Sequence, residues 1–158
     1  YIRLGKKGEP NLESIDDDIN KSTARLILKG EQSIIIGYGP ILQEGLKAAE
    51  ILKKEDIFIN IASIRKLLPF DESFFNLLVK KNITDWYILE EHYKRGGLFS
   101  LLLEWLHKND LLKKIELKSL SFKHEFIHKI GKQDYIRSTH QLNSIAISEI
   151  IKKNENRN

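Results

Sequence analysis

Residues 84–106 read TDWYILEEHYKRGGLFSLLLEWL, and this stretch decides the fold. Trp86 to Leu89 is a short apolar and aromatic run, which is typical of a buried strand. The chain turns polar at Glu90-Glu91-His92, and Gly96-Gly97 then allows one backbone to approach another closely. Dense apolar residues from Leu98 to Leu106 predict a buried helix. The stretch therefore predicts a strand, a polar loop, a glycine pair and a helix.

The rest of the chain alternates in the same way between short β-rich runs and segments with helical spacing. Two β-rich runs at 24–29 and 33–36 are separated by Gly30-Glu31-Gln32, which predicts a hairpin. Later segments predict strands at 57–61 and 115–122, and helices at 41–52, 72–82 (capped by Asp71) and 142–151, with 123–139 irregular. This order predicts an α/β fold of three layers (αβα), with a mostly parallel five-stranded sheet. The run at 24–29 is the expected antiparallel edge strand.

Composition places the chain among ordinary globular domains. It has 158 residues, 41% of them hydrophobic and 30% charged, and no apolar run approaches the roughly 20 residues that span a bilayer. The net charge is +4, but Lys and Glu are interspersed, so we expect neither nucleic-acid nor membrane binding. There is no Cys, which fits a cytoplasmic protein, and there is no Met, which suggests a piece of a longer chain.

The turn residues mark the expected boundaries. Residues 6–22 have the composition of a linker, residues 23–152 read as one compact domain, and residues 153–158 read as a polar tail. Gly37-Tyr38-Gly39 lies between a strand and a helix, but a dinucleotide fingerprint would need a third glycine where Leu42 stands. We therefore interpret it as a tight strand-to-helix turn, whose helix N-terminus could still hold an anion.

Two histidine patterns suggest chemistry. His124-Glu125-Phe126-Ile127-His128 matches the H-E-x-x-H zinc pattern, with Glu149 as a conceivable distant third ligand. The match follows a predicted strand and precedes Gly131, so the helix that zinc proteolysis requires would be short, and we prefer a structural reading. His92, beside Glu90 and Glu91, could shuttle protons or simply orient a loop, and no second catalytic group is identifiable nearby.

Residues Glu90 to Ser100 resemble the E-[ED]-H-x-x-x-G-G-[LF]-G-[SA] signature of the transketolase C-terminal domain, although Phe99 stands where the family usually has a small residue. The form is similar to that in split transketolases and 1-deoxyxylulose-5-phosphate synthases. The runs 34–52 and 61–71 also resemble that domain. Tyr1 to Gly5 resembles the end of the family's pyrimidine-binding domain, and the resemblance implies that Arg3 contacts a substrate phosphate.

The resemblance implies a thiamine diphosphate-dependent transferase that moves a two-carbon ketol unit between sugar phosphates, with magnesium in the full enzyme. It implies that residues 1–5 end a pyrimidine-binding domain and that the chain binds no cofactor alone, has no catalytic residue of its own, and serves homodimer assembly and active-site support. Glu90, Glu91, His92, Gly96 and Gly97 are then an expected active-site or interface loop. A stand-alone interaction module and a zinc hydrolase remain as alternatives. Transketolase, deoxyxylulose-phosphate synthase and keto-acid dehydrogenase beta subunits are not distinguished.

Overall fold

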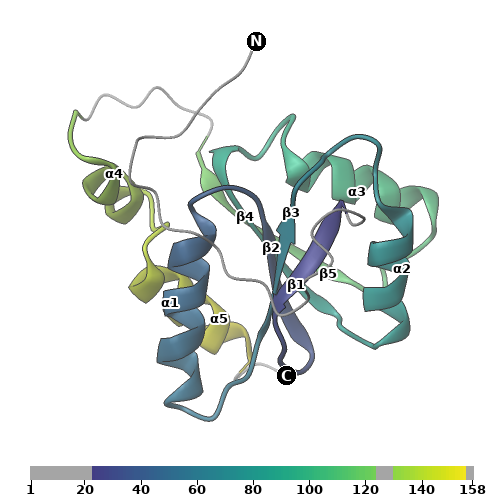
Figure 1. The fold of residues 1–158 in the computed structure, drawn as a ribbon, viewed down its shortest axis with the longest axis horizontal. Helices are drawn as coiled ribbons and strands as arrows, with labels where there is room; N and C mark the ends of the chain where they lie inside the picture. Colours follow the sequence, from purple (N-terminus) through teal and green to yellow (C-terminus); the bar gives the residue numbers. More distant parts are fainter. Residues whose placement is uncertain (1–22, 124–129, 156–158) are drawn as a thin grey trace.

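One twisted sheet with helices on both faces forms the chain, as Figure 1 shows for the computed structural model, which describes residues 23–123 and 130–155. The strands are β1 (Ala24–Leu28), β2 (Ser33–Gly37), β3 (Asn60–Ile64), β4 (Asp85–Tyr93) and β5 (Glu116–Phe122). The helices are α1 (Leu42–Lys53), α2 (Glu72–Lys80), α3 (Leu98–Lys108), α4 (Gln133–Thr139) and α5 (Ser144–Glu155). The strand order is β1-β3-β2-β4-β5, in which β1 alone is antiparallel to its neighbour.

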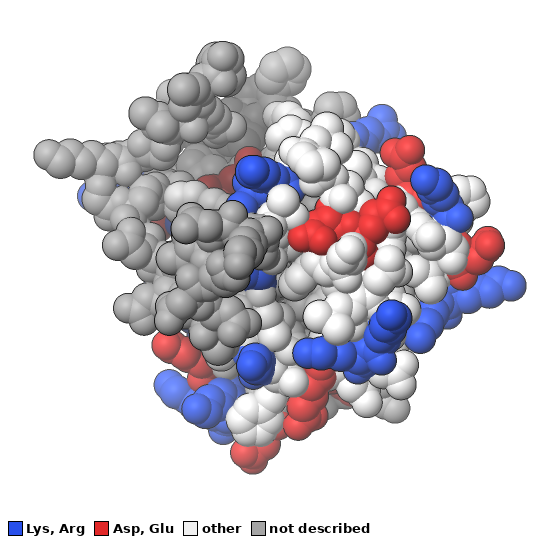
Figure 2. All heavy atoms as spheres, turned by 45° about the vertical axis from the view of Figure 1, so that its right-hand side comes forward, with Lys and Arg blue, Asp and Glu red and all other residues white. Residues whose placement is uncertain are grey.

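Two hydrophobic cores, one on each face of the sheet, confirm the predicted three layers. On one face, Phe75 of α2 and Trp105 of α3 pack under Trp86 of β4. On the other face, the apolar residues of α1 and α5 pack together, including Leu52 and Ile147. Because side chains alternate along a strand, the apolar residues of β2 supply both cores and are fully buried. On the surface, Figure 2 shows cationic and anionic side chains spread over the described part of one face.

The predicted hairpin is wrong, because β1 does not pair with β2. Instead β1 pairs with β3, with Ala24 opposite Ile64, and β3 separates the two predicted partners. The connection at Gly30 crosses the segment that leads into β3, where a Cβ on Gly30 would lie 2.3 Å from the Ile59 carbonyl carbon. Asn60 fixes the crossing, since its side chain accepts from the Gly30 N–H and donates to the Glu31 carbonyl. The prediction of an antiparallel edge strand at 24–29 is nevertheless confirmed.

Three element boundaries also differ from the predictions. The strand expected at 57–61 is β3 at Asn60–Ile64, because the segment before it is held by the loop, with the Phe58 carbonyl accepting from the Glu31 N–H. The segment 123–139, predicted to be irregular, contains α4. The tail predicted at 153–158 is helical as far as Glu155, which is the last residue of α5.

The strand-to-helix turn at Gly37-Tyr38-Gly39 is confirmed. A Cβ on Gly37 would lie 2.4 Å from the Leu89 carbonyl oxygen of β4, and Gly39 has a φ of 72°. Both positions therefore favour glycine for different reasons, the first for close approach and the second for its left-handed backbone. The turn brings Tyr38 to the carboxyl end of the parallel strands.

The predicted cap of α2 is also confirmed. The Phe74 N–H donates to Asp71 Oδ1 at 3.0 Å, and Thr23 Oγ1 donates to Asp71 Oδ2 at 2.5 Å. Asp71 therefore fixes the start of α2 and joins it to the residue that leads into β1, so one carboxylate couples a helix to the sheet edge.

Replacing Asp71 should therefore destabilise the chain. We expect Asp71→Ala to lower the free energy of unfolding by about 1–2 kcal/mol, because one first-turn N–H loses its acceptor. Asp71→Asn is the matched control and should lose less, since Asn is also a good N-cap. Urea unfolding followed by tryptophan fluorescence measures both, and an unchanged midpoint for Asp71→Ala would contradict the assigned cap.

Candidate functional site

The candidate site lies at the carboxyl end of the parallel strands, where β4 is longer than predicted. Glu90, Glu91 and His92 belong to β4 and not to a loop, which corrects the expectation from the sequence. The strand reaches Tyr93 because its pairing with β5 resumes there, with Tyr93 opposite Phe122 after an irregularity that follows Leu89. The polar residues therefore sit on a strand, which sends consecutive side chains to opposite faces of the sheet.

Glu90 points into the molecule and caps α3. Its side chain is fully buried, and its two carboxylate oxygens accept from the Leu98 N–H at 2.9 Å and the Phe99 N–H at 3.3 Å. Tyr38 Oη also donates to Glu90 Oε2, at 3.2 Å. A carboxylate is favoured there because the first turn of a helix has unsatisfied N–H donors and a partial positive charge.

The glycine pair makes this cap possible. A Cβ on Gly97 would lie 2.2 Å from Glu90 Oε2, so Gly97 leaves the space that the carboxylate occupies. Gly96 has a φ of 78°, which favours glycine for the turn that precedes the helix. Phe99, where the resembled family usually has a small residue, is buried and lies under Lys94, whose Nζ is 4.4 Å from the ring centroid.

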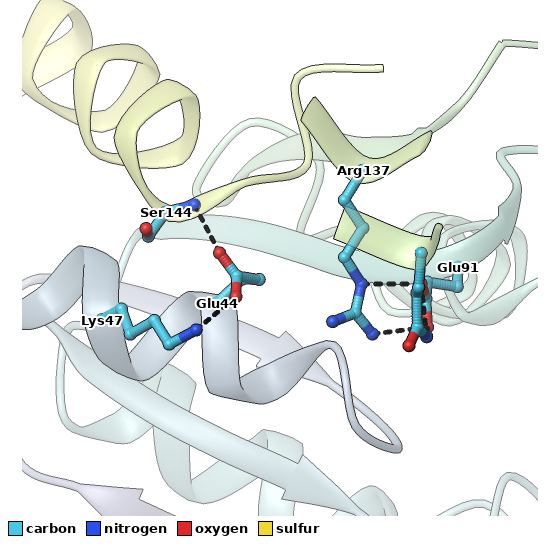
Figure 3. A network of polar contacts seen from close by, with 6 residues as sticks. Glu44, Lys47, Glu91, Arg137 and Ser144 are labelled. Atoms are coloured by element: carbon cyan, nitrogen blue, oxygen red, sulfur yellow. Dashed lines mark hydrogen bonds and ion pairs between the residues drawn. The ribbon is translucent and has the colours of Figure 1, made fainter. Parts of the chain in front are cut away.

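Glu91 points to the opposite face and binds α4. Arg137 Nε and Nη2 donate to its two oxygens at 2.8 and 3.0 Å, and Gln133 Nε2 donates to the same carboxylate. The Arg137 side chain is 7% exposed and that of Glu91 is 24% exposed. This bidentate geometry gives a strong and directional ion pair. Figure 3 shows Arg137 reaching from α4 to Glu91.

Glu44 of α1 completes the polar network in Figure 3. Its carboxylate accepts from Lys47 Nζ and from the Ser144 N–H, both at 2.8 Å. Burial opposes the charged form, but these hydrogen bonds and the charges of Lys47 and Arg137 outweigh it and lower the pKa of Glu44. Glu44 therefore ties α1 to the start of α5, beside the Glu91–Arg137 pair.

His92 is exposed, and the structure does not join it to either neighbouring carboxylate. Its Nδ1 lies 2.7 Å from the Tyr93 carbonyl oxygen, and the two rings meet edge to face. Since the Glu90 and Glu91 carboxylates are bound elsewhere, the described geometry offers His92 no proton-transfer partner. The proton-shuttle hypothesis gains no support from these contacts.

The remaining predicted site residues are Arg3, the His124–His128 pattern and Glu149. Arg3 and the His124–His128 pattern lie outside the described residues, and Glu149 is an exposed residue of α5. Within 23–123 and 130–155, no group of three or more His, Asp or Glu residues is placed to hold a metal ion. Nor does the first turn of α3 suit a diphosphate, because the Glu90 carboxylate already fills it.

Sequence reasoning missed the partners of the two glutamates. Tyr38, Gln133 and Arg137 were not singled out as site residues, and Arg137 lies 46 positions from Glu91. A seven-residue helix gives little periodic signal, so α4 and its inward arginine were not predicted. What the site offers is a set of anchors: Glu90 and Glu91 of β4 hold α3 and α4, and Glu44 of α1 holds the start of α5.

Comparison with known proteins identifies the family. The family model "Transketolase, C-terminal domain" matches residues 22–135. The 1-deoxy-D-xylulose-5-phosphate synthase of Francisella philomiragia is 28% identical over 137 residues, which are 86% of this chain and 21% of that protein. A putative transketolase C-terminal section of Methanocaldococcus jannaschii is 26% identical over 155 residues, covering 96% of this chain and 46% of that protein.

The fold comparison agrees. One solved structure is described as "Split gene transketolase, inactive beta4 tetramer". It superposes on this chain with a TM-score of 0.80 at 22% identity, covering 97% of this chain and 48% of that one. This chain thus spans between about a fifth and a half of the length of each relative named here. In the described part of the chain, no helix has the length and apolar character needed to cross a membrane. The chain belongs to the transketolase C-terminal domain family.

Proposed function

We propose that this chain is the non-catalytic C-terminal domain of a thiamine diphosphate-dependent, transketolase-like enzyme that transfers a two-carbon ketol unit between sugar phosphates. The observation that carries the proposal is the use of the two adjacent carboxylates at the carboxyl edge. Glu90 caps α3 and Glu91 binds Arg137, so both are committed to holding helices. The domain then supports the wall of an active site that other domains supply.

Thiamine diphosphate and magnesium are, in this proposal, bound by the pyrimidine- and diphosphate-binding domains of the enzyme. Residues 1–5 would end the pyrimidine-binding domain, residues 6–22 would form a linker, and Arg3 would bind a substrate phosphate. Support comes from the relatives, since this chain corresponds to about half of the Methanocaldococcus jannaschii section. The solved split-gene relative is described as an inactive tetramer. For the complete enzyme here we propose a homodimer in the cytoplasm.

The test is a comparison of the complete enzyme with pieces of it. Ketol transfer is assayed with sugar phosphates, thiamine diphosphate and magnesium on three samples. They are the complete enzyme, the complete enzyme without residues 23–158, and residues 1–158 alone. We expect activity and a dimer only for the complete enzyme. Ketol transfer by this chain alone would contradict the proposal. Stoichiometric zinc by elemental analysis would instead favour a hydrolase.

The support role predicts that Glu90 matters for stability. We expect Glu90→Ala to lower the free energy of unfolding by about 2–3 kcal/mol, because two first-turn N–H groups and the Tyr38 hydroxyl lose a buried acceptor. Glu104→Ala, at an exposed position of α3, should change the free energy of unfolding by less than about 0.5 kcal/mol. Chemical unfolding followed by tryptophan fluorescence compares the two, and equal midpoints would rule out the assigned cap.

The ion pair between Glu91 and Arg137 should couple α4 to the sheet. We expect Glu91→Ala and Arg137→Ala each to cost about 2–3 kcal/mol, and the double variant to cost less than their sum. The exposed Glu55–Lys152 pair is the control, and Lys152→Ala should cost under about 1 kcal/mol.

In the complete enzyme, Glu91→Gln should leave kcat per assembled dimer within about twofold. A large loss of kcat at unchanged assembly would assign Glu91 a chemical role.

A further inference from the structure

We draw no further inference here: the strongest candidate, the exposed apolar patch of Leu67 and Leu68 on the loop that joins β3 to α2, carries no proposal because nothing among the described residues shows what covers it.

Discussion

The Glu90 carboxylate beneath the first turn of α3 is the contact on which the carboxyl edge depends. It satisfies two N–H groups that a helix leaves without partners, and it sits in the region of positive helix potential. The contact requires β4 to continue past its apolar run, and it requires Gly97 to have no side chain. This cap thus explains why Glu90 and Gly97 stand at this spacing.

Glu91, the next residue of β4, anchors a helix on the other face of the sheet. Because β4 remains extended, Glu91 points away from Glu90 and meets Arg137 of α4. Arg137 also lies close enough to Glu44 to help stabilise its charge, and Glu44 holds the first residue of α5. The two glutamates therefore connect the sheet to different helical layers. Both carboxylates are thus occupied in holding helices, as the proposed support role requires.

Local patterns in the sequence predicted much of the fold. The helical spacing before Lys53, the cap at Asp71 and the apolar run of β4 are all local signals, and each corresponds to an observed element. The pairing of the strands was harder to predict from the sequence. The short link at Gly30 looks like a hairpin turn, but it crosses the segment that leads into β3. The site was only partly predictable. Glu90 and Glu91 were singled out, but their partners lie far along the chain, and Arg137 sits on a helix too short to show periodicity.

The claim that Glu90 is a structural anchor can be tested at the two amides it binds. First-turn amides of a helix normally lack acceptors and exchange quickly with solvent, so hydrogen exchange at Leu98 and Phe99 is diagnostic. We expect both amides in the native chain to exchange at least about a hundredfold more slowly than an unstructured peptide of the same sequence. Exchange of both at the unstructured rate would show that the carboxylate is not held there, and the account of this edge would then fail.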